Sequence, residues 1–162
     1  MSKFFKKKTS ITPTASSSSG SSNNPFLKTP LTRELVTSWS TSLETLLACQ
    51  RGREQFLKFC EQEHSEENLD FWEHCEALKR KTDQQDIKRF AQRMFSKFFN
   101  EAGKYELGVS QEIRDGIRRE MMNPTIHTYD VAQAFIYSLM QLECYPRFIQ
   151  SQMYKDLKEN SM

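Results

Sequence analysis

The sequence lacks the motifs that carry enzymatic or metal chemistry. It contains no glycine-rich phosphate loop, no nucleophile elbow and no paired cysteines or histidines at metal-ligand spacing. The histidines, His64, His74 and His127, do not have the spacing of a helical metal pair. Glu66 and Glu67 do not form an acid–base pair, because adjacent residues of a helix do not face each other. We therefore expect no catalytic residue, no metal and no cofactor, and a protein that is not itself an enzyme.

Cysteines are few and long apolar runs are missing. Cys49, Cys60, Cys75 and Cys144 form no CxxC pair, and without a secretory signal we expect reduced thiols. Most stand among apolar residues, where cysteine behaves as a small hydrophobic residue, and only the role of Cys144 is left open. No apolar run approaches the roughly 20 residues that a membrane-spanning helix needs. The expected location is cytoplasmic.

Acidic residues are absent from positions 1–30, which contain five lysines. Subtracting these lysines from the 23 basic and 21 acidic residues of the chain leaves 18 basic and 21 acidic residues for positions 31–162, a net charge of −3. Nucleic-acid binding needs a clustered cationic face, so this balance argues against nucleic acid as a partner.

Positions 9–25 are rich in serine, threonine, proline and asparagine and contain little to bury. Such a segment cannot recover the entropy lost on ordering, so we expect a disordered tail over 1–30 and one domain over 31–162. Lysines beside an anionic membrane contribute about 1 kcal/mol each, and phenylalanine adds apolar contact. Peripheral contact with the inner face of the plasma membrane is one interpretation of the tail, and a solvated start is the other. The residues concerned are Lys3, Phe4, Phe5, Lys6, Lys7 and Lys8.

Helical periodicity continues from Leu31 nearly to the end of the chain, without an alternating segment long enough for a strand. The domain is therefore predicted to be all-α. The pattern predicts a first helix across 35–47 and a last helix from Pro146 through Leu157. Ser65 is a good N-cap for a helix with acidic residues in its first turn, where the helix dipole favours anions.

Fragments along about 36–158 resemble, in order, the regulator of G-protein signalling (RGS) domain. The short flanks are similar to those of small members that consist of little more than this domain. The resemblance implies a fold of about nine helices, with an antiparallel four-helix bundle and a subdomain of terminal helices. The fragments are Trp39-Ser40, Leu46-Leu47, Ser65-Glu66-Glu67-Asn68-Leu69, Phe71-Trp72, Cys75-Glu76, Pro124-Thr125, Tyr129-Asp130, Ala132-Gln133, Leu139-Met140, Tyr145-Pro146-Arg147-Phe148 and Tyr154.

The resemblance also implies an activity, acceleration of GTP hydrolysis by heterotrimeric G-protein α subunits. Such α subunits carry their own arginine and a glutamine that orients water. The domain would stabilise the switch regions in the transition state and so end the signal. The implied partner is the α subunit in its GTP or transition-state form, bound by a monomer.

Carried over residue by residue, the resemblance implies a contact surface made of three loops at one end of the bundle. In the third loop an acid, Glu143, accepts a switch-loop amide and Arg147 holds that acid in place. Trp72, Phe95 and Phe148 should be core residues. The implied contact residues are His64, Ser65, Glu67 and Asn68 in the first loop, Glu106 and Gly108 in the second, and Leu139, Glu143, Cys144 and Arg147 in the third.

Four of these positions depart from the common family pattern. Gly108 stands where many members carry an asparagine that reaches toward the glutamine of the α subunit, and glycine has no side-chain donor or acceptor to offer. Glu143 replaces an aspartate, Cys144 a serine and His64 an aromatic residue. Two hypotheses follow: a GTPase-activating protein, or a binding module that docks on the activated α subunit as effector antagonist or scaffold, with weak or no acceleration of hydrolysis.

Overall fold

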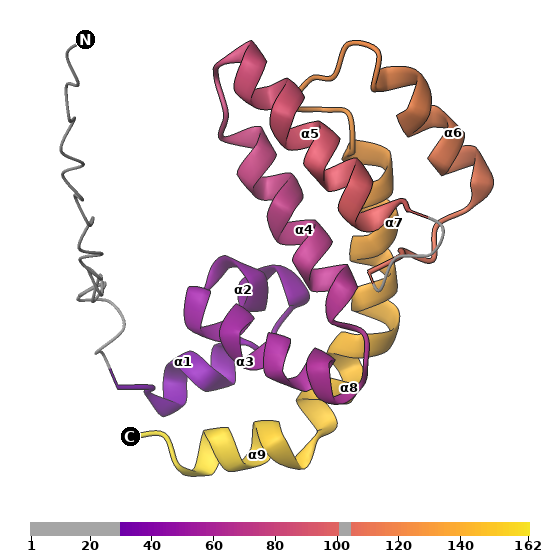
Figure 1. The fold of residues 1–162 in the computed structure, drawn as a ribbon. Coiled ribbons are helices and arrows are strands. Elements are labelled where there is room, and N and C mark those ends of the chain that lie inside the picture. The colour runs from indigo at the N-terminus through magenta and orange to yellow at the C-terminus, as the bar shows by residue number, and fades with distance from the viewer. Residues whose placement is uncertain (1–29, 101–104) are drawn as a thin grey trace, which may run out of the picture.

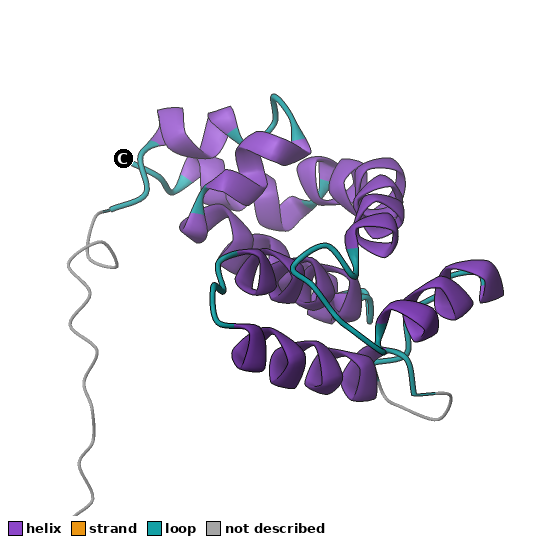
Figure 2. Cartoon of the chain, turned by 90° about the horizontal axis from the view of Figure 1, so that it is seen from above, coloured by secondary structure: helices purple, strands orange, loops and turns teal. Residues whose placement is uncertain are grey.

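The computed structural model describes residues 30–100 and 105–162, and within them every regular element is a helix (Figure 1). Seen from above, these ranges contain helices and connecting loops without a strand (Figure 2). This confirms the predicted all-α class. The elements are α1 (Arg33–Ser38), α2 (Leu43–Ala48), α3 (Gln50–Gln62), α4 (Glu66–Lys79), α5 (Gln84–Phe98), α6 (Gln111–Glu120), α7 (Asp130–Leu139), the π-helical turn η2 (Met140–Cys144), α8 (Tyr145–Gln150) and α9 (Gln152–Glu159).

The helices form the two expected parts, an antiparallel four-helix bundle and a subdomain of terminal helices. In the bundle, α4 packs against both α5 and α7, and α6 lies beyond α5 (Figure 1). In the subdomain, α1 packs on α9, α2 on α3, and α3 on α8. The continuous run of α7, η2 and α8 connects the bundle to the subdomain. The end of the bundle nearest α8 is therefore in contact with the subdomain, through η2 and through the packing of α3 on α8.

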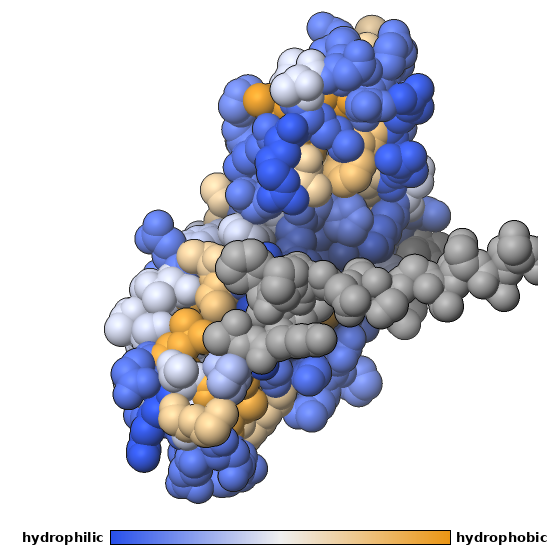
Figure 3. All heavy atoms as spheres, turned by 90° about the vertical axis from the view of Figure 1, so that its left-hand side faces the viewer, coloured by the Kyte–Doolittle hydropathy of each residue, from blue (hydrophilic) through white to orange (hydrophobic). Residues whose placement is uncertain are grey.

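The first and last segments of the domain are joined by hydrogen bonds. Arg33 N donates to Met162 O at 2.9 Å, and Met162 N donates to Leu31 O at 3.1 Å. Deeper in the subdomain, the buried Tyr154 hydroxyl donates to Val36 O at 2.7 Å. The surface over the bundle is mostly hydrophilic on the side drawn in Figure 3, and hydrophobic residues gather on the terminal-helix part.

Two of the expected helices are each divided into two by a serine. The predicted first helix is α1 and α2, because Ser40 and Thr41 hydroxyls bond to carbonyls three residues back, and Ser42 Oγ then caps α2 by accepting from Thr45 N at 3.0 Å. Such local bonds compete with the helical pattern. The predicted last helix is likewise divided into α8 and α9, since Ser151 has an extended backbone and caps α9.

Aromatic residues dominate the core, but only one of three predicted core aromatics is fully buried. Phe148 lies 5.4 Å from Phe56 and 5.5 Å from Phe59, between ring centroids. Trp72 and Phe95 are only partly buried at the edge of the core. Successive residues of a helix point about 100° apart, so Phe71 takes the centre and its neighbour Trp72 does not.

Candidate functional site

The antiparallel bundle brings the three predicted contact segments to one end. The chain runs away from this end along α4 and returns along α5, and it then runs away along α6 and returns along α7 (Figure 1). The start of α4, the end of α5 and the end of α7 therefore lie at the same end of the bundle. In sequence these places are the α3–α4 turn, the loop before α6, and η2 with the start of α8. The first and third segments are also joined by direct contacts.

The α3–α4 turn is short and strained. His64 has φ 54, and among the described residues it is the only non-glycine residue with a positive φ. Side chains rarely adopt this left-handed conformation, and residues that do often lie at functional sites. Ser65 N donates to Cys60 O at 2.9 Å, which closes the end of α3. The turn therefore leaves Glu63 and His64 exposed at a defined place on the surface.

Ser65 stands at the predicted N-cap position of α4, but its hydroxyl does not cap the helix. Instead, Ser65 Oγ lies 3.0 Å from Cys144 Sγ, at the end of η2. This contact joins the first segment to the third, although the two residues are 79 positions apart in the chain. A side-chain hydroxyl has several rotamers to choose from, and only the tertiary structure places the sulfur within its reach.

The third segment is built on the π-helical turn between α7 and α8. Single π turns inside helices occur frequently at functional sites, because the extra residue changes the direction in which the side chains point. Leu139, Glu143 and Arg147 follow one another at intervals of four along one face. Leu139 is half-buried, Glu143 and Arg147 are exposed, and Cys144 is buried.

Arg147 pairs with an acid that the sequence did not point to. Its Nε lies 3.2 Å from Glu63 Oε2, and its Nη2 is 3.8 Å from Cys144 Sγ. Here Arg147 therefore pairs with Glu63 of the α3–α4 turn. The predicted role of Arg147 in holding Glu143 against a switch-loop amide stays a prediction. The role of Glu63 left no signal in the sequence, because it stands outside the motif and far from Arg147 in the chain.

Cys144 lies in surroundings that lower the pKa of its thiol. A hydrogen bond from the Cys60 thiol, another from the Ser65 hydroxyl and the charge of Arg147 lower the pKa of Cys144 to about 6, against the opposing effect of burial. The same hydrogen bond, together with burial, raises the pKa of Cys60.

Glu67 and Asn68 lie in the first turn of α4 and are both half-buried. Burial raises the pKa of the Glu67 carboxyl, and the neighbouring Glu66 adds to this, while a hydrogen bond from the backbone amide of Glu67 opposes it. A partly desolvated carboxylate is a stronger acceptor for a partner's amide than a fully solvated one. Asn68 adds both a donor and an acceptor beside it.

The second segment is anchored on each side of Gly108. Arg114 Nη2 donates to Glu106 Oε1 at 2.9 Å and to Leu107 O at 2.7 Å. Leu107 is fully buried, and Val109 is nearly so. Gly108 itself is exposed, and a Cβ built there meets no atom within 4 Å. The glycine is therefore not required by packing, and an added side chain would point into open space.

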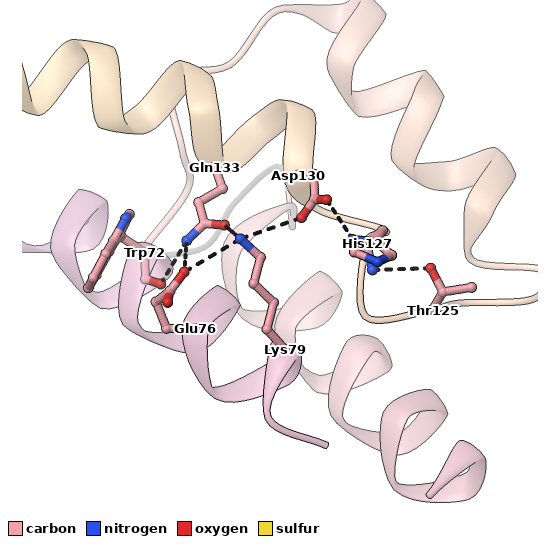
Figure 4. Close-up of polar contacts among 7 residues, drawn as sticks. All are labelled: Trp72, Glu76, Lys79, Thr125, His127, Asp130 and Gln133. Carbon is pink, nitrogen blue, oxygen red and sulfur yellow. Dashed lines mark hydrogen bonds and ion pairs between the residues drawn. The ribbon is translucent and has the colours of Figure 1, made fainter. Parts of the chain in front are cut away.

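Several motif fragments of the sequence meet in a polar network between α4 and α7, away from the contact segments (Figure 4). Gln133, which is buried, donates from Nε2 to Glu76 Oε1 at 2.8 Å and accepts from Lys79 Nζ at 2.5 Å. Lys79 Nζ also lies 3.6 Å from Asp130 Oδ1, and His127 Nδ1 is 2.8 Å from Asp130 Oδ2. These residues hold two helices of the bundle together.

Neither a metal centre nor a membrane span is found in the part of the chain that the structure describes. No group of three or more His, Cys, Asp and Glu side chains there is arranged to hold a metal ion. No described helix is both long enough and apolar enough to cross a membrane. The lysine and phenylalanine cluster over residues 3–8 lies outside the described residues.

The architecture is that of the RGS-type fold, a four-helix bundle with a subdomain of terminal helices. The family model of the regulator of G protein signaling domain matches residues 42–157. The chain therefore belongs to the RGS family, as the sequence fragments predicted.

Relatives in several animals support this assignment. The chain is 37% identical over 126 residues to regulator of G-protein signaling 20 of Gallus gallus, and the matched region covers 78% of this chain and 58% of that protein. It is 36% identical over 126 residues to regulator of G-protein signaling rgs-2 of Caenorhabditis elegans, covering 78% and 75%. Regulator of G-protein signaling 1 of Xenopus tropicalis is 32% identical over 146 residues, covering 90% and 73%. The chain thus spans less than two thirds of the Gallus gallus relative.

Proposed function

We propose that this chain is a GTPase-activating protein for heterotrimeric G-protein α subunits, with residues 31–162 as the active domain. The observation that carries the proposal is the joined surface at one end of the bundle. There, Ser65 contacts Cys144 at 3.0 Å and Glu63 contacts Arg147 at 3.2 Å. These two contacts fix the relative positions of the first and third segments before any partner binds. Glu67 and Asn68 belong to the first of these segments, and Leu139 and Glu143 belong to the third.

A fixed surface is what this kind of catalysis requires. The α subunit supplies its own arginine and glutamine, and its switch loops must be held in the productive arrangement. A partner that is already ordered loses less entropy when it holds them, so more of its binding energy can stabilise the transition state. Glu67 and Glu143 offer carboxylate acceptors for switch-loop amides, and Asn68 offers both a donor and an acceptor.

Gly108 favours a second candidate function. The segment has no side chain at the position from which many family members reach toward the α subunit's glutamine. A domain with this gap could dock through the first and third segments as an effector antagonist or scaffold and accelerate hydrolysis weakly or not at all. The two functions share one surface and differ in the preference for the transition state.

The deciding measurement compares binding to α·GDP·AlF₄⁻ with binding to α·GDP, followed by single-turnover GTP hydrolysis. We expect tighter binding to the aluminium fluoride complex, which mimics the transition state. Asn68→Ala should weaken binding and slow hydrolysis, while Gln92→Ala, an exposed amide on α5, serves as the matched control. Equal affinity for both nucleotide states, together with no acceleration of hydrolysis, would reject the GTPase-activating function and favour the docking function.

The tail is tested separately. We propose that residues 1–30 add contact with anionic membranes at the inner face of the plasma membrane through the cluster at residues 3–8, and that the domain acts as a monomer. Deleting residues 1–30 should reduce partition onto vesicles that contain phosphatidylserine. Unchanged partition would remove the membrane proposal without affecting the α-subunit proposal. Sedimentation of the full chain tests the monomer.

A further inference from the structure

A hollow on the surface of α9 lies beside the point where the described chain begins. Its apolar part is formed by Leu31, Met153 and Leu157, each half-buried against the core. Its volume is about 500 Å³, within the range of about 300–1,000 Å³ of pockets that hold a ligand. None of the contact residues named above lines it. The polar lining residues are Asp156, Asn160 and Ser161.

The start of the domain is held in place next to this hollow. Arg33 N donates to Met162 O at 2.9 Å, and Leu31 O accepts from Met162 N at 3.1 Å. The two ends of the described chain therefore lie side by side near α9 (Figure 1). The residues that precede Pro30 must leave the domain from this place, at the rim of the hollow.

The sequence immediately before this point contains an apolar pair, which lies outside the described residues. Phe26 and Leu27 stand five and four positions before Leu31, and Ile11 is the only other large apolar residue of positions 9–30. An extended chain spans at most about 3.3–3.6 Å per residue, so Phe26 can lie no further than about 18 Å from Leu31. Such a short connection gives the pair an effective concentration at the hollow in roughly the millimolar range.

We propose that Phe26 and Leu27 dock in this hollow, so that residues 25–29 belong to the folded domain and pack on α9. The proposal goes beyond the α-subunit function and does not depend on it. Lys28 follows the apolar pair in the sequence, and the exposed carboxylate of Asp156 offers it an opposite charge. The apolar side chains supply the contact and the charges set its direction.

Two prolines lower the cost of ordering this segment. Pro25 and Pro30 bracket it in the sequence. Proline fixes its own φ and disfavours the helical region for the residue before it. A chain with fewer accessible conformations loses less entropy when it docks. The segment therefore needs only a modest apolar contact to stay in the hollow.

Other occupants fit the hollow less well. A second copy of the chain has to reach it by diffusion, without the advantage of a short connection. An anionic membrane surface attracts lysine and arginine, whereas the described residues that line this hollow include the Asp156 carboxylate and neither of those cations. The attached segment has the matching charge and is always within reach.

The first test looks for the contact in the full chain by nuclear magnetic resonance. We expect nuclear Overhauser effects between the ring protons of Phe26 and the methyl groups of Met153 and Leu157. Phe26→Ser should shift those methyl resonances, and the matched control Ile11→Ser should leave them in place. Absent Overhauser effects, together with unchanged methyl shifts in Phe26→Ser, would overturn the proposal.

The second test measures thermal unfolding of the same full-length variants. We expect Phe26→Ser to lower the melting temperature by about 2–4 °C, the shift typical of a chain of this size when part of one large apolar contact is lost. Ile11→Ser should not change it. In a Leu157→Ala background, which already widens the hollow, Phe26→Ser should have a smaller effect. Equal effects of Phe26→Ser in both backgrounds would contradict docking at this place.

The same variants separate the other occupants. If the effect of Phe26→Ser disappears on dilution of the protein, the hollow is filled by a second copy. If the effect appears only when vesicles containing phosphatidylserine are added, the pair contacts lipid instead. Either result would overturn docking within one chain, and we expect the effect to be independent of protein concentration and of vesicles.

Discussion

The ion pair between Arg147 and Glu63 can be removed to separate its part in the fold from its part in docking. The perturbation is a double-mutant cycle of Glu63→Gln, Arg147→Ala and the combined variant. The side chain of Glu63 is 39% exposed and that of Arg147 is 51% exposed, and Arg147 Nε lies 3.2 Å from Glu63 Oε2. Both groups are substantially solvated, so screening keeps the energy of the pair small.

The magnitude follows from that exposure. Coulomb attraction at about 4 Å is about 1 kcal/mol in water, and holding two long side chains in one arrangement offsets part of it. We therefore expect a coupling energy for folding of about 0.2–1 kcal/mol, falling further in high salt. For binding, Arg147→Ala removes a guanidinium that orients the turn against η2, and we expect at least a tenfold loss, about 1.4 kcal/mol.

The assays are urea unfolding for stability and titration against α·GDP·AlF₄⁻ for affinity. Arg119→Ala, an exposed arginine on α6, is the matched control. Small changes in stability with a large loss of affinity would support the reasoning. A loss of more than about 2 kcal/mol in stability would show that Arg147 acts mainly in the fold. Unchanged affinity would refute the assignment of this surface.

Three further predictions concern the core, the second segment and pH. Phe148→Ala should cost about 3–5 kcal/mol in urea unfolding, since its ring is fully buried, whereas Phe135→Ala on the outer face of α7 should cost less than about 1 kcal/mol. Gly108→Asn should change stability by less than about 0.5 kcal/mol, because the added side chain meets no atom, and it should raise the single-turnover rate; an unchanged rate would show that this position is not limiting. A side-chain hydrogen bond with Asp70 raises the pKa of His74 above 6.5, with burial opposing, so this contribution to stability is full below about pH 6.5 and is lost as pH rises through the raised pKa. Thermal unfolding between pH 5 and pH 9, roughly spanning this titration, should show that decline in the wild type and less of it in His74→Phe, and equal profiles would contradict it.

Helix positions were predictable wherever the local chemistry was strong. Asp83 and Ser110 stand at the N-caps of α5 and α6, and each accepts a hydrogen bond from the backbone N three residues later. The division of the first and last predicted helices was missed because periodicity continues across a break. The apolar residues on both sides of Ser42 and of Ser151 still face one core, so the pattern alone does not reveal where the backbone turns.

The site residues were predictable as members of a family, but their partners were not. Ser65 was identified as a helix cap from its position, and the hydroxyl instead contacts Cys144. No pattern in the sequence indicated that Arg147 also pairs with Glu63. Both contacts depend on which distant groups arrive within about 3–4 Å, and no local pattern encodes that distance.

The all-α class, the RGS family and the starts of α4 and α8 could be read from the amino-acid sequence, because they follow from side-chain periodicity, capping chemistry and motif order within short stretches. Only the folded chain shows that the Ser65 hydroxyl lies beside Cys144, that Arg147 pairs with Glu63, and that Gly108 borders open space. No local pattern predicts these contacts, because hydrogen bonds and ion pairs act only at contact distance. Packing α3 against α8 creates those contacts between residues that are remote in the chain.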